Sequence, residues 1–530
     1  MRFRNYISLC LLLLITQRMH AQSLPVGSIL ESYVKQLYLQ NHLDSNLSFT
    51  HRPLSAAYIQ QSLNIKDTLA HADYLDFKKI KTGINKATLS ILPFRWEQQI
   101  NTHHPYGWND GAMIPARGYQ TLLSGGFHFK YGPLSVQIQP EYVWAANTDF
   151  ETTGIIKGGT DQPERFGNRN YSRANLGQSY IQLQVSKFAL KLSNENIWWG
   201  PGQRNALLLS NHADGFMHLA LQSTAPLKTP LGSIEFQLIG GKLQGSDYDF
   251  SARKEWRYFS GMHLTYQPRW IPGLFFGLTR SFQAYHTDVE ESGEYFPYLM
   301  PYQKINTDDG DPIPRDQLTS VYAKWLFPEA HAEVYVEFGK NDNAWDFRDF
   351  LGSPEHARAY LFGFRKLVPL KQKETFISVQ GEFTQLSQTI DRILRPAGAW
   401  YYHGEVLQGM THNGQVLGAG IGSGSNLQSL DISWIKGLKS LGFRVERLVN
   451  DQDYYHAAIG DYNNQSRRWV DYSFALLGRW NWRQLVLNSE INYIRSLNYQ
   501  WRNLTPAGNY LPMGKDQNNL HLRLGLNYFF

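Results

Sequence analysis

The chain has 530 residues, a formal net charge of +6, 18% charged residues and 14% aromatic residues. Its mean hydropathy of −0.41 is far too polar for a helical membrane protein. The single cysteine, Cys10, lies in an apolar N-terminal stretch, so the rest of the chain has no thiol for a disulfide, a metal site or a nucleophile.

Residues 1–21 have the pattern of a cleaved secretory signal. Two arginines precede an apolar core at 7–15, and a small residue, Ala21, stands before Gln22. The core is shorter than the roughly 20 residues that a transmembrane helix needs. The leader carries three arginines and no acidic residue, so its removal lowers the formal charge from +6 to +3. We therefore expect a secreted chain without a nucleic-acid partner.

Residues 22–85 have a helical pattern and are predicted to form a small periplasmic α-helical domain. Ser28 is a candidate N-cap for a segment whose apolar residues recur at three- and four-residue spacing. A second such stretch follows Pro53, and a third, weaker one runs over 67–77. The alternative is that these helices are only a long leader to the first strand.

From residue 86 to residue 530 the apolar pattern changes to a period of two. Apolar and aromatic residues alternate with Gln, Glu and Ser at 134–144, 181–185 and 332–338. In a transmembrane barrel the apolar face meets lipid and the polar face meets a hydrated lumen. We predict an all-β fold, a large antiparallel transmembrane β-barrel of roughly 16 to 20 strands, since a spanning strand takes about 10 residues.

The last strand of this pattern, at 520–530, ends on the aromatic residue Phe530. An ordinary sheet would leave it as an exposed edge, whereas a closed barrel pairs its last strand with its first. This end resembles the terminal strands of bacterial outer-membrane barrels, whose last aromatic residue is read by the insertion machinery. We expect the cell outer membrane as location, with outer-membrane lipid, lipopolysaccharide and the barrel-insertion machinery as partners.

Paired tryptophans beside a tight turn form the sharpest motif. Trp198 and Trp199 precede a Gly-Pro-Gly turn, and Arg204 follows it. Sugar recognition uses flat apolar rings next to planar donors and acceptors of this kind. The alternative is a turn at the barrel rim with interfacial tryptophans.

Two further stretches interrupt the alternation. The first is PEHARAY at 354–360, and the second is YYHGEVLQGMTHNGQVLGAGIGSGSN at 401–426. The glycines of the second stretch permit close backbone approach, but no βαβ pattern surrounds them, which argues against a phosphate-binding loop.

These three motifs, in their order and spacing, resemble the capsule assembly Wzi family as found in the Bacteroidetes, over essentially the whole mature chain. The resemblance implies an eighteen-stranded outer-membrane barrel with a helical domain on the periplasmic side. It also implies a lectin-like, non-enzymatic protein that binds surface polysaccharide and helps to assemble or anchor it. The candidate polysaccharide-binding residues are Trp198, Trp199, Arg204, His356, Arg358, Tyr402, His403, Gln408 and His412. The alternative role for these residues is to pack the lumen and close the barrel.

Other functions have weaker support in the sequence. Ser210, His212 and Asp214 are residue types of a hydrolase, but neighbours on an extended chain point to opposite faces and do not form a triad. No HExxH motif is present, and the acidic run at 308–311 lacks the rest of a calcium loop. We therefore predict no catalytic residue, metal or cofactor. The remaining alternative is a passive porin for small hydrophilic solutes, which conductance would distinguish from a plugged barrel.

Overall fold

The computed structural model describes residues 22–63, 79–80, 87–152, 161–248, 253–299, 313–341, 347–388, 398–459, 468–502 and 515–530. The predicted signal at 1–21, the third helical stretch at 67–77 and the acidic run at 308–311 therefore lie outside the described residues. In the described part of the chain, no helix is both long enough and apolar enough to cross a membrane.

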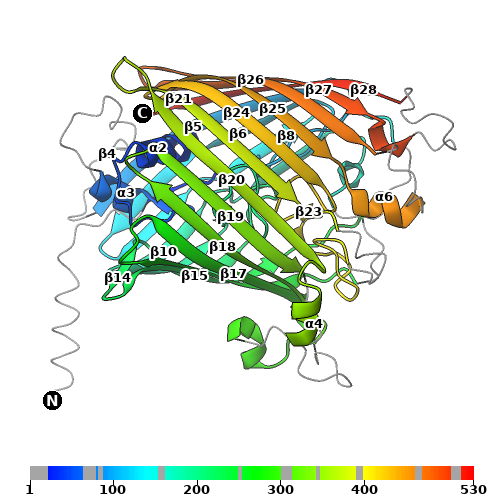
Figure 1. The fold of residues 1–530 in the computed structure, drawn as a ribbon, viewed down its shortest axis with the longest axis horizontal. Coiled ribbons are helices and arrows are strands. Elements are labelled where there is room, and N and C mark those ends of the chain that lie inside the picture. The colour runs from blue at the N-terminus through cyan, green and yellow to red at the C-terminus, as the bar shows by residue number, and fades with distance from the viewer. Residues whose placement is uncertain are drawn as a thin grey trace.

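The chain forms one closed antiparallel barrel (Figure 1). Its strand segments are β4 (Lys79–Ile80), β5 (Ala87–Asn101), β6 (Gly118–Tyr131), β7 (Leu134–Ile138), β8 (Glu141–Ala145), β9 (Tyr171–Asn175), β10 (Tyr180–Val185), β11 (Phe188–Ser193), β13 (His218–Ser223), β14 (Leu227–Thr229), β15 (Gly232–Leu243), β16 (Arg257–Pro268), β17 (Leu274–Tyr285), β18 (Asp316–Phe327), β19 (Ala332–Asn341), β20 (Arg358–Pro369), β21 (Thr375–Gln385), β24 (Asn426–Lys436), β25 (Lys439–Val449), β26 (Val470–Trp482), β27 (Leu485–Leu497) and β28 (Gln517–Tyr528).

These 22 segments make 18 barrel strands in the described part of the chain. β7 and β8 both pair with β6, so together they count as one interrupted strand. β10 pairs with β7 and β9 pairs with β8, so β9 and β10 together count as the next strand. β13 and β14 likewise both pair with β15 and count as one strand. The two-residue segment β4 pairs with β5 only at Ser90 and Leu89 and is not counted as a barrel strand. β28 pairs with β5, from His521 opposite Asn101 to Tyr528 opposite Phe94, and closes the barrel. The predicted barrel and the eighteen strands that the resemblance implied are confirmed.

The alternation in the sequence separates a lipid-type face from a lumen face. On β19, Val334 and Val336 are exposed on the outside, whereas Glu333 and Glu337 are buried inside. On β28, Leu524 and Tyr528 point outward and His521 is buried in the lumen. The apolar outer face and the polar inner face are those of a transmembrane barrel.

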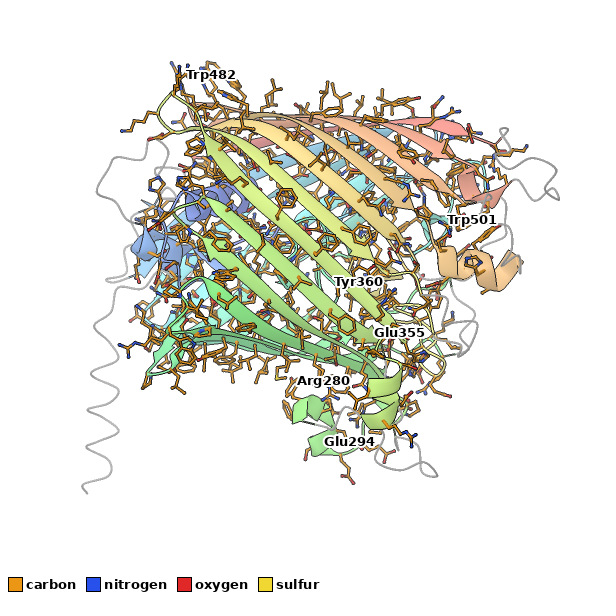
Figure 2. The ribbon with its side chains drawn as sticks, in the orientation of Figure 1. Arg280, Glu294, Glu355, Tyr360, Trp482 and Trp501 are labelled. Carbon is orange, nitrogen blue, oxygen red and sulfur yellow. The ribbon has the colours of Figure 1, made fainter. Side chains whose placement is uncertain are left out.

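The two ends of the barrel differ in the length of their connections. At the short-turn end, two residues join each of several strand pairs: 132–133, 186–187, 230–231, 437–438 and 483–484. At the long-loop end, the connections include 102–117, 194–217 and 386–425. Figure 2 shows Trp482 at the short-turn end, and Glu355 and Trp501 at the long-loop end. The short helices α4 (Phe347–Gly352) and α6 (Gln452–Ile459) also lie at the long-loop end (Figure 1).

The N-terminal segment, defined as residues 22–63, lies at the short-turn end (Figure 1). It contains β1 (Ser23–Leu24), α2 (Ile29–Leu39), β2 (His51–Arg52), β3 (Leu54–Ser55) and α3 (Ala56–Ser62). As the sequence predicts, Ser28 caps α2, and its hydroxyl accepts the Glu31 backbone N–H at 3.2 Å.

The helix α2 is buried around most of its circumference, as expected of a helix inside a core. It shares an apolar cluster with α3 and with wall residues such as Leu326, Leu367 and Phe529. The helices therefore pack against the barrel itself, and a separate helical domain over 22–85 stays a prediction.

Candidate functional site

The paired tryptophans lie in the lumen, in a short strand β12 (Trp198–Trp199) that pairs with β2 of the N-terminal segment. Trp198 stands opposite Arg52, and Trp199 stands opposite His51. The next residue, Gly200, donates its N–H to the Thr50 carbonyl at 2.8 Å. Gly200 has φ = +101°, and a Cβ there would lie 2.7 Å from the carboxylate of Glu337. Glycine is therefore required where this turn meets the inner wall.

Both indole rings are enclosed by protein. Trp199 is fully buried, and its Nε1 donates a hydrogen bond of 2.6 Å to Oε1 of Gln237 on β15. Trp198 is 3% exposed, and the guanidinium of Arg52 lies over it, 4.4 Å from the ring centroid. Arg52 is itself paired with Glu31 at 2.7 Å. A sugar would reach these rings only after the N-terminal segment moved, so the geometry favours the lumen-packing alternative for the two tryptophans.

Arg204 also connects the turn to the wall. Its guanidinium lies 4.7 Å from the ring centroid of Trp108 and pairs with Glu446 of β25. The backbone N–H groups of Gln203, Arg204 and Asn205 all donate to the carboxylate of Glu382 on β21. The wall carboxylates of Glu382 and Glu446 thus bind the turn at 203–205 and fix its position inside the lumen.

The stretch 401–426 forms hydrogen bonds with the loop that carries the paired tryptophans. The Tyr401 hydroxyl donates to the Leu207 carbonyl at 2.9 Å and accepts the Ala419 N–H at 2.7 Å. The Ser210 N–H donates to the Leu417 carbonyl at 2.7 Å. Most of the buried apolar residues of both motifs belong to one cluster with inward-facing wall residues, whereas Trp198 packs in a separate cluster with Val26 and Ala206. The loop 194–217 and the stretch 398–425 therefore fill much of the lumen.

Gln408 and His412 are buried in this packing. Oε1 of Gln408 accepts the Ser246 N–H at 3.0 Å, and Nδ1 of His412 accepts the Gln244 N–H at 3.1 Å. His412 lies in the small hairpin of β22 (Thr411–His412) and β23 (Gln415–Val416). Burial lowers the pKa of His412 to about 4, so the ring is neutral at pH 7. Both side chains therefore have structural partners.

The remaining four predicted residues lie at the long-loop end. Tyr402 and His403 are half-buried, and Nδ1 of His403 accepts the Glu405 and Val406 N–H groups at 3.2 and 3.1 Å. His356 is half-buried. Arg358 is buried, and its guanidinium lies 4.8 Å from the ring centroid of Tyr360.

Asn341 brings these two stretches together at the long-loop end. Its N–H donates to the Ala357 carbonyl at 2.8 Å, and its side-chain amide donates to the Ala399 carbonyl at 3.2 Å. The structure thus divides the nine predicted residues into a group that packs inside the lumen and a group around the barrel mouth.

Two carboxylates in the lumen were not singled out as partners by sequence reasoning. Asp161 pairs with Nε2 of His212 at 2.7 Å and with Arg165 at 3.1 Å. Asp214 pairs with Arg173 at 3.1 Å and accepts the side-chain amide of Asn413 at 3.0 Å. Asp161 and Arg165 are only four residues apart, but folding alone brings Asp161 to His212, and Asp214 to Arg173 and Asn413, so no local spacing could have indicated those pairs.

The possible hydrolase residues do not form a hydrogen-bonded triad. The Ser210 hydroxyl donates to the Gly418 carbonyl at 2.5 Å, whereas the His212 ring bonds Asp161. In the described ranges, no group of three or more His, Cys, Asp or Glu side chains is placed to hold a metal ion.

Comparisons with known proteins agree with the architecture. The family model of capsule assembly protein Wzi matches residues 110–497. The fold is similar to the solved structure of Wzi from Escherichia coli, an outer-membrane protein involved in group 1 capsule assembly and a carbohydrate-binding β-barrel. That similarity has a TM-score of 0.65 at 15% identity and covers 96% of this chain and 100% of that chain.

Other solved barrels are more distant. OccK7 (OpdD) of Pseudomonas aeruginosa has a TM-score of 0.41 at 11% identity, over 84% of this chain and 99% of that chain. OccAB2 of Acinetobacter baumannii has a TM-score of 0.41 at 10% identity, over 85% of this chain and 99% of that chain. No curated protein matches the chain.

Proposed function

The chain belongs to the capsule assembly Wzi family, and from this we propose that it binds exported capsular or exopolysaccharide and helps to assemble or anchor it at the cell surface. The Escherichia coli Wzi barrel, which has the same fold, is a carbohydrate-binding protein of capsule assembly. The proposal is non-enzymatic: the protein holds the polysaccharide rather than altering its bonds.

The filled lumen is the observation that carries this proposal over a passive porin. A porin needs a continuous wet pore. Here Trp199, Trp400, Tyr401 and Met410 are fully buried in a cluster that the inward loops share with the wall. The N-terminal segment adds a second buried cluster at the short-turn end. This interior supports a barrel that presents a surface to a polymer rather than a channel for solutes.

We propose that the long-loop end faces the cell exterior and that the N-terminal segment faces the periplasm. Short periplasmic turns and long external loops are the rule in outer-membrane barrels. The apolar outer band would contact outer-membrane lipid and lipopolysaccharide, and the C-terminal Phe530 would engage the insertion machinery. Polysaccharide arriving at the outer face then meets the long-loop end first.

Within the candidate residues, we assign polysaccharide contact to Tyr402, His403 and His356, with Arg358 beside them. The first three are half-buried at the barrel mouth, where a polymer has access. We assign a packing role that supports the mouth to the five residues with partners inside the lumen: Trp198, Trp199, Arg204, Gln408 and His412. Tyr402 supplies a ring face, and the histidines supply polar edges for sugar hydroxyls.

Binding of the refolded barrel to the host's own purified surface polysaccharide tests the function, with an unrelated barrel as control. We expect saturable binding that soluble native glycan competes away. The variant Tyr402→Ala with His403→Ala should bind less and still insert, whereas Trp198→Ala with Trp199→Ala should impair folding. Absence of binding together with steady single-channel conductance would favour a porin instead.

A further inference from the structure

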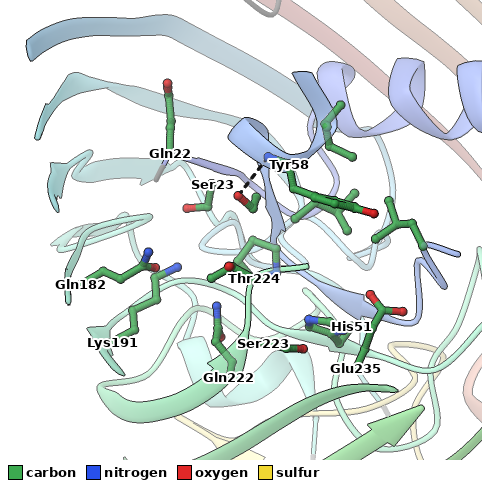
Figure 3. Close-up of a pocket in the computed structure, with 15 residues that line it drawn as sticks. Gln22, Ser23, His51, Tyr58, Gln182, Lys191, Gln222, Ser223, Thr224 and Glu235 are labelled. Atoms are coloured by element: carbon green, nitrogen blue, oxygen red, sulfur yellow. Dashed lines mark hydrogen bonds between the residues drawn. The ribbon is translucent and has the colours of Figure 1, made fainter. Parts of the chain in front are cut away.

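The N-terminal segment leaves little free space inside the short-turn end. The gap between it and strands β10, β11, β13 and β15 has a volume of about 30 Å³, which is room for about two water molecules (Figure 3). Its charged side chains already have partners: Lys191 pairs with Glu195, and Glu235 accepts the Ser48 N–H at 2.9 Å. A larger ligand at this end of the barrel must therefore bind on the outside.

The outside of the short-turn end carries a dense group of cations in three neighbouring connections, 370–374, 437–438 and 483–484. These connections join β20 to β21, β24 to β25 and β26 to β27, which follow one another around the barrel. With their directly flanking residues, they hold one acidic side chain, Glu374, and five basic ones. We call these five residues the basic patch: Lys371, Lys373, Lys436, Lys439 and Arg483. Lys439 is half-buried, and the other four are exposed.

The outward residues of β24 place Lys436 at the depth of lipid headgroups. From the middle of the strand towards the turn they are Leu430, Ile432, Trp434 and Lys436. Leu430 and Ile432 are exposed on the apolar band that faces acyl chains. Tryptophan is enriched at the membrane–water interface, so the outward residue that follows Trp434 reaches the headgroup layer. Lipid, rather than a soluble protein, therefore covers this face.

Lys436 and Lys439 stand directly opposite each other across the β24–β25 turn. Directly opposite residues share one face of the sheet, so both ammonium groups lie on the outer face. Like charges in this position repel each other and destabilise the hairpin. Neither lysine forms an ion pair with any residue that the structure describes. An anion between them would remove the repulsion, and phosphate is an anion that lysine binds well.

Two exposed tryptophans of β26 lie beside cations of the basic patch. Nζ of Lys439 is 4.3 Å from the ring centroid of Trp480, and the guanidinium of Arg483 is 5.8 Å from the ring centroid of Trp482. Figure 2 shows Trp482 at the edge of the short-turn end. Each ring offers an apolar face next to a positive charge. An amphipathic lipid with an anionic headgroup needs this combination.

The basic patch is denser in charge than the rest of the short-turn end. Lys228 and Arg269 belong to two separate hairpins, β14–β15 and β16–β17. The β18–β19 turn holds Glu329 and no lysine or arginine. The uneven distribution around the rim indicates a localised site rather than a uniform ring of charge.

We propose that the basic patch binds the headgroup of an anionic phospholipid, of the phosphatidylglycerol or cardiolipin kind, in the inner leaflet of the outer membrane. The phosphate would lie between Lys436 and Lys439, and an acyl chain would follow the exposed Leu441 and Trp480. Clusters of about four to eight lysines and arginines beside a membrane-spanning segment bind anionic lipids.

The choice of leaflet rests on the orientation proposed above, in which the short-turn end faces the periplasm. Lipopolysaccharide occupies the opposite leaflet, at the long-loop end. The site goes beyond polysaccharide contact, because it lies at the other end of the barrel and takes a different class of ligand. Its occupation would hold the barrel at a fixed depth in the membrane.

Native mass spectrometry of the full-length refolded barrel in detergent micelles tests the site. The probes are phosphatidylglycerol, cardiolipin, zwitterionic phosphatidylethanolamine, lipid A and inorganic phosphate. We expect an anionic phospholipid to bind about tenfold more tightly than phosphatidylethanolamine and lipid A, and equimolar phosphate to leave it bound. Equal binding of phosphatidylethanolamine, a preference for lipid A, or displacement by equimolar phosphate overturns the proposal.

Variants then locate the binding. Lys436→Gln with Lys439→Gln should weaken the anionic phospholipid about tenfold. The matched control Lys228→Gln with Arg269→Gln removes the same charge from the same end, outside the basic patch, and should leave the affinity unchanged. Equal weakening in both would mean that overall charge attracts the lipid, and the site would be wrong. Heat-modifiable migration in electrophoresis checks that every variant is folded.

The repulsion between the two lysines gives a second measurement. In micelles without anionic lipid, Lys436→Gln should be at least as stable to heat as the wild type, because it relieves the repulsion. Added phosphatidylglycerol should raise the unfolding temperature of the wild type, since it binds the folded state, and should raise that of the variant less. A variant that is less stable without lipid, or equally stabilised by lipid, contradicts the site.

Polysaccharide binding in the same variants separates this proposal from the function above. Lys436→Gln with Lys439→Gln should lose the lipid and keep the polysaccharide. If the wild type binds the anionic phospholipid but no polysaccharide, the proposed function fails and the lipid site stands.

Discussion

The guanidinium of Arg204 and the carboxylate of Glu446 form a two-point ion pair across the lumen. Nε donates to Oε1 at 2.7 Å, and Nη2 donates to Oε2 at 2.9 Å. Arg204 belongs to the turn after the paired tryptophans, whereas Glu446 belongs to the wall strand β25. This planar fork fixes the turn in one orientation. The turn is therefore part of the barrel's internal structure.

Breaking this pair from one side should destabilise the protein strongly. In Glu446→Gln the half-buried guanidinium of Arg204 loses its ion-pair partner, which costs about 1.5–3 kcal/mol for hydrogen bonds to a charged group. Thermal unfolding in detergent micelles measures the loss. The double variant Arg204→Met with Glu446→Met removes both charges and should recover most of the stability. An equal loss of stability in the single and double variants would show that the unpaired charge of Arg204 is not the cause of the destabilisation.

The hydrogen bond between Trp199 and Gln237 gives a second stability test. Trp199→Phe keeps most of the ring but leaves Oε1 of Gln237 unpaired in a buried site, at a cost of about 1–3 kcal/mol. The control Trp480→Phe changes a tryptophan that is 53% exposed on the outer face and should shift stability by less than about 0.5 kcal/mol. A similar loss in both variants would contradict a specific role for the buried N–H.

The barrel could be predicted from the sequence because its signal is local. Alternation along 332–338 places Val334 outside and Glu337 inside whatever the neighbouring strand is. The filling of the lumen depends on pairings between distant residues, such as Trp199 with His51. Nothing in the WWGPG run distinguishes a ring stacked on sugar from a ring packed on Arg52. The motif was therefore recognisable, but its environment was not.

Acid should loosen the N-terminal segment through Glu31. Burial opposes ionisation of this carboxyl group, but the charges of Lys35 and Arg52 outweigh burial and lower its pKa to about 2. A depressed folded-state pKa gives stability that is fully present above pH 4.5 and is lost as the pH falls towards 2. Protease sensitivity of the segment between pH 5 and 2.5 measures this loss.

The variant Glu31→Gln is the control for this acid effect. This variant should be less stable than the wild type at pH 7, and its protease sensitivity should no longer rise between pH 4.5 and 2. Buried His51 lowers the stability at higher pH than Glu31 does. Burial lowers the pKa of His51 to about 4, so between pH 6.5 and 4 the unfolded chain takes up a proton that the folded protein does not, and the stability falls. An unchanged acid profile in Glu31→Gln would assign the loosening to other groups.

A disulfide should lock the N-terminal segment to the wall. The side-chain oxygens of Thr50 and Thr265 on β16 are 2.8 Å apart and buried, so the two side chains point toward each other, as the partners of a disulfide must. Cys10, the only native cysteine, lies in the predicted leader. Thr50→Cys with Thr265→Cys should therefore cross-link under mild oxidation, as a shift in non-reducing electrophoresis.

The cross-link also tests whether the acid effect is a movement of the segment. The linked protein should resist protease at pH 2.5, and reduction should restore the sensitivity. The control Thr50→Cys with Ser473→Cys places the second thiol on β26, eight strands from β16 around the barrel, and should not cross-link. Because the two threonines meet only when the segment is seated inside the barrel, failure of the first pair to link in folded protein would mean that the segment lies elsewhere.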